Sequence, residues 1–208
     1  MNKPTRIILL RHGEVENPGS VFYGQQNVSL SDSGRKQSLA LADRLKDIPL
    51  SMVFSSDLSR CLFLAEAIAG ERGLAVEARS ELREVDFGRW AGLSWEAVEA
   101  RYPGALSERM GKLESYRPPQ GENLVEVALR VWRVIDEVLK KCKEEAVAIV
   151  SHGGVNRVLI ARATGFPLKN IFSLEQDFAC VNVLDFYPDG PVTLRLLNWS
   201  ADKGITSV

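Results

Sequence analysis

The sequence predicts an α/β fold, a three-layer sandwich with a mainly parallel central sheet, helices on both faces and a small cap region. Short apolar runs that suit strands buried on both faces alternate along the chain with stretches of helical periodicity. Such alternation is typical of parallel strands that are connected by helices. The 208 residues fit one domain, so we expect a single domain over residues 1–208, with the cap at about residues 93–119.

The first part of the chain predicts two strands and two helices. Residues 7–10 are wholly apolar, as expected of a strand that is buried on both faces. A loop rich in Gly, Asn and Ser follows, and residues 34–47 then repeat apolar side chains at helical spacing. Residues 51–55 predict a second strand, and residues 59–72 predict a helix with an Ala and Leu face.

The middle of the chain is less regular. Residues 82–92 mix charged residues with glycines and predict no regular element. Ser94 can cap a helix that continues to about Arg101. Residues 103–120 read as irregular and end in a Pro-Pro pair. The position and irregularity of residues 93–119 suggest that this segment forms the cap and closes over a bound ligand.

The longest helical pattern covers residues 122–143 and should pack one stripe of side chains in the core. The predicted stripe consists of Val125, Leu129, Trp132, Ile135 and Leu139. A buried strand at residues 146–150 and a helix at residues 155–163 should follow. Two strands at residues 181–186 and 192–198 then read as a hairpin around a Pro-Asp-Gly turn.

Composition narrows the function classes. Apolar residues make up 45% and charged residues 25% of the chain, which is ordinary for a soluble globular protein. The net charge of −1 argues against a nucleic-acid or membrane partner, so an anionic ligand would need a local cluster of cations. Three scattered cysteines, Cys61, Cys142 and Cys180, predict no disulfide framework and favour a cytoplasmic setting. We expect no signal peptide and no membrane span. Oligomeric state is left open.

The chain has two histidines, and both occupy the same kind of position. His12 and His152 each directly follow a predicted strand and directly precede a glycine. Ligands of open α/β sheets bind beyond the carboxyl ends of the strands, so both side chains should lie at one edge of the sheet. Gly153-Gly154 also opens a predicted helix, whose free N–H groups suit an anion. A functional pair is favoured over two structural or exposed histidines.

The motifs of other kinds of catalytic or binding site can be compared with this histidine pair. A zinc site normally needs three or four protein ligands, and the chain has no third histidine. There is no Gly-x-Ser-x-Gly elbow, Walker A loop or dinucleotide fingerprint. Arg11, beside His12, suits a phosphoryl group because a guanidinium can bind it with two hydrogen bonds. Arg60 offers a second cation, although on its own it reads as an exposed helix residue.

Four motifs, in order, resemble those of the histidine phosphatase superfamily, also called the phosphoglycerate-mutase-like family. They are Leu10-Arg11-His12-Gly13-Glu14, the stretch Ser55-Ser56-Asp57-Leu58-Ser59-Arg60, residues 82–92, and Ser151-His152-Gly153-Gly154. The resemblance covers roughly residues 6–160 and implies a single histidine phosphatase domain. It implies a phosphatase that needs no metal and no cofactor.

The resemblance also implies roles for the matched residues. His12 would attack phosphorus and become phosphorylated, while Glu84 would protonate the leaving oxygen and then activate water. Phosphoryl oxygens would be bound by the remaining matched residues, Arg11, Arg60 and His152, with further hydrogen bonds from Asn17 and the amide of Gly153. Of the neighbouring carboxylates Glu81 and Asp86, Asp86 is the alternative acid.

These roles make demands on the two titrating side chains. His12 must keep one ring nitrogen unprotonated, so its other nitrogen should donate to a backbone carbonyl. Nearby cations should lower its pKa and keep the ring neutral. Glu84 must hold a proton long enough to act as an acid, which calls for a raised pKa.

The cap segment and a few motif residues bear on the type of reaction and on the substrate. The cap is short compared with that of the mutases, which favours hydrolysis over phosphoglycerate mutase activity. Residues 87–92 and Tyr23-Gly24 most resemble the α-ribazole phosphatase branch of cobalamin assembly, so α-ribazole 5′-phosphate is a candidate substrate. Ala91, Asn27 and Asn123 depart from the family pattern. A protein-directed phosphatase and a phosphate-binding module without turnover are the alternatives.

Four aromatic residues around the predicted cap have two interpretations. They could stack on a ring of the substrate, or they could be packing bulk, which is the commoner use of aromatic side chains. The four are Trp90, Trp95, Tyr102 and Tyr116.

Overall fold

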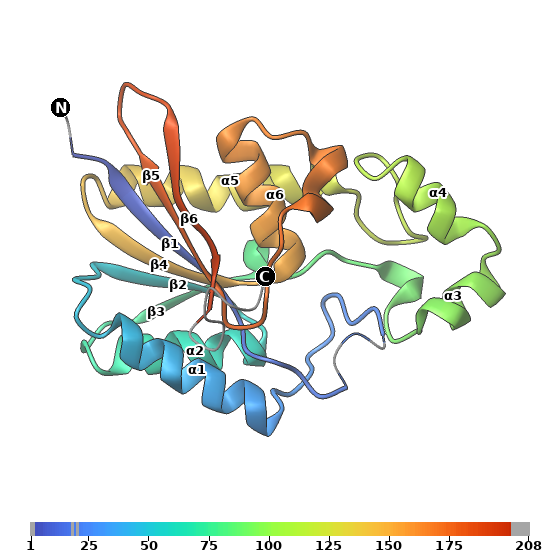
Figure 1. The fold of residues 1–208 in the computed structure, drawn as a ribbon, viewed down its shortest axis with the longest axis horizontal. Helices are drawn as coiled ribbons and strands as arrows, with labels where there is room; N and C mark the ends of the chain where they lie inside the picture. Colours follow the sequence, from blue (N-terminus) through green and yellow to red (C-terminus); the bar gives the residue numbers. More distant parts are fainter. Residues whose placement is uncertain (1–2, 18, 20, 201–208) are drawn as a thin grey trace.

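The computed structural model describes residues 3–17, 19 and 21–200 (Figure 1). Six strands form one sheet in the order β3-β2-β4-β1-β5-β6. Strands β3, β2, β4 and β1 pair in parallel, whereas β5 is antiparallel to β1, and β6 to β5. The strands are β1 (Thr5–Arg11), β2 (Met52–Ser56), β3 (Val76–Arg79), β4 (Ala146–Ser151), β5 (Val181–Phe186) and β6 (Val192–Trp199).

Helices cover both faces of this sheet, which confirms the predicted three-layer sandwich. One face packs under α5 and α6, and the other over α1 and α2. The α-helices are α1 (Asp32–Leu45), α2 (Ser59–Gly70), α3 (Trp95–Arg101), α4 (Ala105–Gly111), α5 (Leu124–Lys141) and α6 (Gly153–Thr164). Short 3₁₀ helices are η1 (Ser80–Leu82), η2 (Gly88–Trp90) and η3 (Leu168–Ser173).

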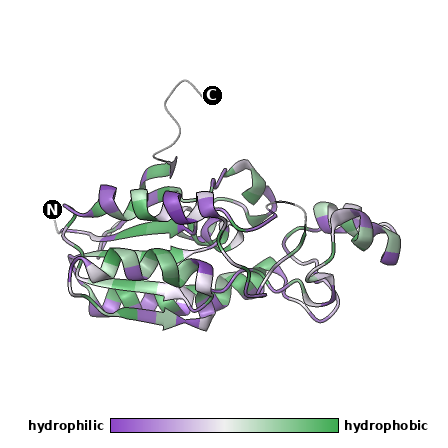
Figure 2. Cartoon of the chain, turned by 90° about the horizontal axis from the view of Figure 1, so that it is seen from below, coloured by the Kyte–Doolittle hydropathy of each residue, from purple (hydrophilic) through white to green (hydrophobic). Residues whose placement is uncertain are grey.

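The central strands are apolar because both of their faces are buried. In β1, Ile7 and Leu9 face the α5/α6 layer while Ile8 and Leu10 face the α1/α2 layer. In Figure 2, hydrophobic residues run through the central strands and the helices packed on them, with hydrophilic residues interspersed along the helices. The parallel strands at the centre of the sheet could be predicted from the sequence because they are short apolar runs.

Among the strands and α-helices that the structure describes, two were not predicted. Strand β3 lies at the edge of the sheet, and its sequence Val-Glu-Ala-Arg has only four residues, none of them buried. Helix α4 has only seven residues and begins after Gly104, which has a φ of 80°. Both lack the long apolar pattern on which a prediction from sequence depends.

The predicted core stripe of α5 is wrong in part. Val125 and Leu129 are 44% and 53% exposed, whereas Ile135 is fully buried and Trp132 and Leu139 pack partly buried against the core. The buried face consists of Leu124, Val127, Ala128, Val131, Val134, Ile135 and Val138. The helix carries apolar residues around more than half of its circumference near its start, and the denser stripe faces the sheet.

Helices α3 and α4 lie beyond the end of the sheet, apart from the sandwich (Figure 1). Ser94 caps α3 by accepting from the amide of Ala97, as predicted. The segment has a small core of its own around Trp90 and Val98. Its role as a cap, and the single-domain organisation, stay predictions. No helix within the described residues is long and apolar enough to cross a membrane.

Candidate active site

The two histidines lie side by side at the carboxyl ends of adjacent strands, as predicted. Arg11 at the end of β1 is in register with Ser151 at the end of β4, and the next residue of each strand is a histidine. The amide of His12 donates to the carbonyl of Ser151 at 3.1 Å. The imidazole centroids of His12 and His152 are 5.1 Å apart, in an edge-to-face arrangement.

His12 has the hydrogen bond that a nucleophilic imidazole needs. Its Nδ1 is 2.7 Å from the carbonyl oxygen of Gly13, which can only accept, so Nδ1 carries the proton and Nε2 the lone pair. Burial, followed by the charges of Arg11 and Arg60, lowers the pKa of His12 well below its usual value. The ring is therefore neutral at neutral pH, as predicted.

Arg60 is buried at the start of α2, so the reading as an exposed helix residue is wrong. Its Nη1 and Nη2 donate to the carbonyls of Gln26 and Gly24 at 2.7 and 2.8 Å. Its Nε donates to Nδ1 of His152 at 3.3 Å. The loop after β1 thus holds the guanidinium at the edge of the pocket.

His152 lies behind His12 and has no exposed surface. Because Nδ1 accepts from Arg60, the proton is on Nε2, which donates to the hydroxyl of Ser56 at 2.9 Å. Burial and the charge of Arg60 lower the pKa of this imidazole well below its usual value. Both ring nitrogens already have partners, so a direct bond from His152 to a phosphoryl oxygen requires the ring to exchange one of them.

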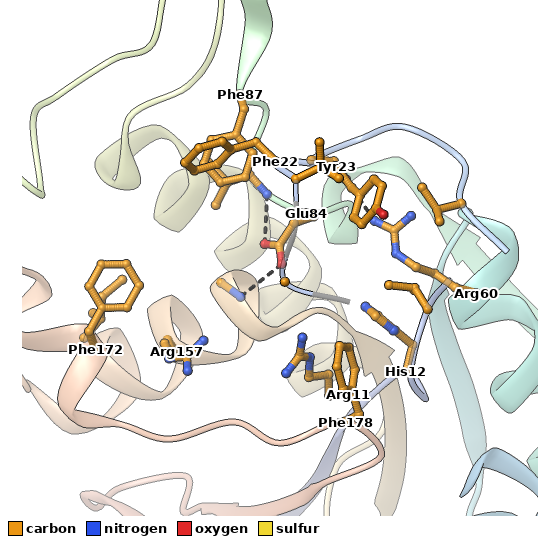
Figure 3. A pocket seen from close by; sticks show the side chains of 18 of the residues that line it. Arg11, His12, Phe22, Tyr23, Arg60, Glu84, Phe87, Arg157, Phe172 and Phe178 are labelled. Carbon is orange, nitrogen blue, oxygen red and sulfur yellow. Dashed lines mark hydrogen bonds between the residues drawn. The ribbon is translucent and has the colours of Figure 1, made fainter. Parts of the chain in front are cut away.

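Arg11 faces the pocket from the end of β1 (Figure 3). Its Nη1 donates to the carbonyl of Gln176 at 2.5 Å, and its Cζ lies 3.9 Å from the centroid of the Phe178 ring. A β-carbon on Gly153 would lie 3.3 Å from Cζ and Nε of Arg11, so the absence of a side chain lets α6 approach the guanidinium closely.

Glu84 reaches the same pocket from the loop after η1. Its Oε1 accepts from the amide of Val85 at 2.9 Å and its Oε2 from the amide of Gly154 at 3.1 Å, as Figure 3 shows. A β-carbon on Gly154 would lie 2.5 Å from Oε1. The bare start of α6 therefore sets the position of this carboxylate.

The Glu84 loop is anchored from the side of α5. Arg130 donates from Nη2 to the carbonyl of Glu84 at 3.0 Å and makes two bonds to the carboxylate of Glu122, at 2.8 and 2.9 Å. The two other carboxylates of this stretch, Glu81 and Asp86, do not line the pocket, and Asp86 accepts from the amide of Gly88. This placement favours Glu84 as the acid.

The pocket has a volume of about 350 Å³, which suits a small ligand. Of the predicted site residues, Arg11, His12, Arg60 and Glu84 line it directly. Asn17 and Gly153 are not lining residues. Asn17 has a φ of 50°, and its carbonyl accepts from the hydroxyl of Tyr23 at 3.1 Å. The predicted contacts of Asn17 and of the Gly153 amide with phosphate stay predictions.

Of the four aromatic residues singled out in the sequence, only Trp95 lines the pocket. Trp90 is fully buried, and Tyr102 and Tyr116 pack against it in the small core beside α3. The other aromatic rings that line the pocket were not predicted to contact a ligand. These are Phe22, Tyr23, Phe87, Phe172 and Phe178.

Three further polar residues of the site were also missed. Arg157 lies four residues after Gly153 on α6, so helical spacing from the His-Gly-Gly motif gave a signal for it. Ser56 lies inside the second motif, but nothing in the sequence pairs it with His152. Arg109 comes from the unpredicted helix α4 and had no signal.

The cysteines and metal ligands can be assessed from the same geometry. Cys61 lies 3.4 Å from Nε2 of His152, but burial raises the pKa of its thiol to about 12, so it stays protonated. All three cysteines are free and buried. Within the part of the chain that the structure describes, no three His, Cys, Asp or Glu side chains group in a way that could hold a metal ion.

Comparison with known proteins places this site in a family. Residues 7–199 match the histidine phosphatase superfamily (branch 1). The glucosyl-3-phosphoglycerate phosphatase of Mycolicibacterium vanbaalenii is 35% identical over 175 residues, which cover 79% of this chain and 76% of that protein. Phosphoserine phosphatase 1 of Hydrogenobacter thermophilus is 31% identical over 92% of this chain and 91% of that protein. Some curated relatives are longer, and this chain spans 54% of their length.

The fold agrees with these matches. The crystal structure of the α-ribazole phosphatase from Shigella flexneri has a TM-score of 0.85 at 28% identity, covering 94% of this chain and 96% of that one. The relatives carry the names of different phosphatases, so the matches do not single out the α-ribazole branch. With the family pattern extending over residues 7–199, the chain belongs to the histidine phosphatase superfamily, branch 1, and is a phosphatase of that superfamily.

Proposed function

We propose that this protein is a metal-independent phosphomonoesterase that hydrolyses small phosphorylated metabolites through a phosphohistidine at His12. The observation that carries the proposal is the hydrogen bond from Nδ1 of His12 to Gly13, which leaves a neutral Nε2 between Arg11 and Arg60. A neutral imidazole flanked by two guanidiniums attracts a phosphoryl group and presents a lone pair to it.

In the first step, Nε2 of His12 attacks phosphorus while the bond to the leaving oxygen breaks. Glu84 gives its proton to that oxygen, so a neutral alcohol departs and a carboxylate remains. Arg11 and Arg60 neutralise charge on the phosphoryl oxygens, which is the main contribution that a protein makes to this class of transfer. His152 supports this arrangement from behind through its bond with Arg60.

In the second step, water attacks the phosphoryl group and the N–P bond breaks. The Glu84 carboxylate takes a proton from that water, and His12 returns to its neutral form. Inorganic phosphate leaves, and the site is restored. Transfer to a second substrate hydroxyl instead of water would make the enzyme a mutase, and the short segment between α3 and α5 supports hydrolysis.

The substrate is proposed only as a class. The resemblance of residues 87–92 and the Shigella flexneri structure support α-ribazole 5′-phosphate as a candidate. The curated relatives are named for glucosyl-3-phosphoglycerate and phosphoserine, which makes these two further candidates. A pocket of about 350 Å³ with several aromatic walls supports a metabolite of moderate size.

Hydrolysis of p-nitrophenyl phosphate in EDTA tests the proposal. The wild type should turn over without added metal, and His12→Ala should lose about 10⁴-fold or more in kcat, because no other side chain can form the intermediate. A phosphoglycerate transfer assay distinguishes the mutase. Activity that persists in His12→Ala, or that EDTA abolishes, would contradict the proposal.

A further inference from the structure

The pocket contains more positive charge than the phosphoryl group needs. Among the residues that the structure describes, those lining the pocket include four arginines but a single carboxylate, that of Glu84. The proposed reaction uses Arg11 and Arg60 for the phosphoryl oxygens. Arg109 and Arg157 line the same pocket and have no part in that reaction. Buried cations are normally paired, so this surplus points to a ligand.

Arg109 shows the surplus most clearly. It projects from α4 and is only 8% exposed, yet its guanidinium forms no hydrogen bond and no ion pair with any residue that the structure describes. Its contacts are with two aromatic faces, since its Cζ lies 5.7 Å from the ring centroid of Phe87 and 5.6 Å from that of Phe172. Five N–H donors on one buried cation call for an oxygen-rich partner.

Arg157 lies between Arg109 and the residues that bind the phosphoryl group. Its Cζ is 5.8 Å from the same Phe172 ring, and its Nη1 would lie 3.2 Å from a β-carbon on Gly153, beside the Arg11 guanidinium. Its Nε donates to the carbonyl of Leu174 at 2.7 Å, which fixes the side chain and leaves its terminal amino groups for a ligand. Figure 3 shows Arg157 between Phe172 and Arg11.

We propose that Arg109 and Arg157 form a second anion subsite, so that the preferred substrate carries a carboxylate or second phosphate besides the phosphoryl group that is removed. The inference rests on the proposed function and narrows its substrate class. It favours substrates with two anionic groups over α-ribazole 5′-phosphate, whose only anionic group is the phosphate. The Phe172 ring lies 5.6 Å from Cζ of Arg109 and 5.8 Å from Cζ of Arg157, so it gives the intervening part of the substrate an apolar wall.

Binding of non-hydrolysable phosphonates tests this subsite without requiring turnover. Titration calorimetry would compare 3-phosphonopropionate, 4-phosphonobutyrate and 5-phosphonopentanoate with the alkyl phosphonates of equal chain length. At least one of the three carboxylate-bearing phosphonates should bind about tenfold or more tightly than the alkyl phosphonate of equal chain length. Two charge-assisted hydrogen bonds would allow a gain of this size. The chain length of that compound measures the separation of the two anions. Alkane bisphosphonates of the same lengths show whether carboxylate or phosphate is preferred.

Substitutions then assign the gain to the two arginines. Arg109→Met should reduce the tenfold gain to about twofold or less, and Arg109→Lys should keep part of it, because an ammonium retains the charge without the fork of donors. Arg157→Met should also reduce it. Arg101→Met removes an exposed arginine of the neighbouring α3 that does not line the pocket, and it should leave the gain unchanged.

Two results would overturn the proposal of a second anion subsite. One is the absence of a gain from a second anion at any chain length, including no binding at all. The other is a gain that persists in both Arg109→Met and Arg157→Met, with folding verified by circular dichroism. Because these measurements involve no catalysis, a wild type that binds the carboxylates tightly but does not hydrolyse p-nitrophenyl phosphate would instead contradict the proposed function.

Discussion

The two ends of the pocket differ in how their charged groups are held. At the strand end, Arg60, His152 and Glu84 each hydrogen-bond to backbone or side-chain partners at 2.7 to 3.3 Å. At the end that faces α4, the Arg109 guanidinium lies beside two aromatic rings and has no hydrogen bond or ion pair with a described residue. Charged groups that are already held in place suit the transfer of the phosphoryl group, which all substrates share. A charged group without a protein partner is suited to bind the part of the substrate that differs from one substrate to another.

The two ends of the pocket also come from different kinds of sequence segment. The strand end is formed where the central parallel strands stop, so both of its histidines directly follow short apolar runs in the sequence. The other end is formed mostly by the short helix α4 and by irregular segments, together with Arg157 of α6. Relatives that share the first end can therefore differ at the second, and the different names of the relatives are consistent with that division.

The largest effect among further substitutions at the strand end should come from Glu84→Gln. An amide cannot give up a proton, so hydrolysis of alkyl phosphates should fall by about 10²- to 10⁴-fold in kcat, with a smaller loss for p-nitrophenyl phosphate, whose leaving group needs no proton. Steady-state kinetics on both substrates measures the difference. Glu81→Gln, which removes a nearby carboxylate outside the pocket, is the control, and an equal loss there would contradict the assignment.

Gly154→Ala should give the next largest effect. A β-carbon at this position would meet Oε1 of Glu84 at 2.5 Å, so the carboxylate must move away from the bond it makes with the amide. We expect kcat to fall about 10- to 100-fold with little change in Tm, because small displacements of a catalytic group are costly. Gly70→Ala, in α2 with open space around it, is the control. Unchanged kcat in Gly154→Ala would show that α6 does not position the acid.

A smaller effect is expected from Ser56→Ala. The substitution removes the partner of Nε2 of His152 and leaves a buried N–H unsatisfied, which typically costs about 1–3 kcal/mol of stability. Arg60 loses part of its support, so KM for phosphomonoesters should rise more than kcat falls. Ser55→Ala, on the same strand with its hydroxyl bonded to the carbonyl of Ser56, is the matched control. A KM equal to that of the wild type would show that the position of His152 does not affect phosphate binding.

The pH dependence gives the subtlest test of the strand end. Burial and two arginines lower the pKa of His12, and the neutral ring is the reactive form, so kcat/KM should stay flat as pH falls through 6.5 and decline only below it. The folded state binds fewer protons than the unfolded chain at this group, so its contribution to stability is present above pH 6.5 and is lost as the pH falls below it. An acidic limb centred at 6.5 or above would contradict the neutral, buried His12.

Much of the strand end could be predicted from the sequence because it depends on local patterns. An apolar run followed by His-Gly places His12 and His152 at the sheet edge, and the observed register confirms that they meet. The hydrogen bond of His12 with Gly13 was also expected, since a nucleophilic imidazole requires it.

The parts that were missed depend on tertiary context. Strand β3 is an edge strand of four residues without buried side chains, and α4 is too short to show periodicity, so the place of Arg109 in the pocket had no local signal. On α5, two apolar stripes compete and only packing decides between them, which is why Val125 and Leu129 turned out exposed.

The most direct measurement is the capture of the phosphorylated enzyme. Glu84→Gln should still be phosphorylated by p-nitrophenyl phosphate, but the attack of water should be slowed, so the intermediate should accumulate. Rapid quenching under alkaline conditions, proteolysis and mass spectrometry would locate the phosphoryl group. The account predicts it on His12 and predicts that it is absent from His12→Ala. A phosphoryl group on any other residue, or none on His12 while p-nitrophenol is released, would contradict it.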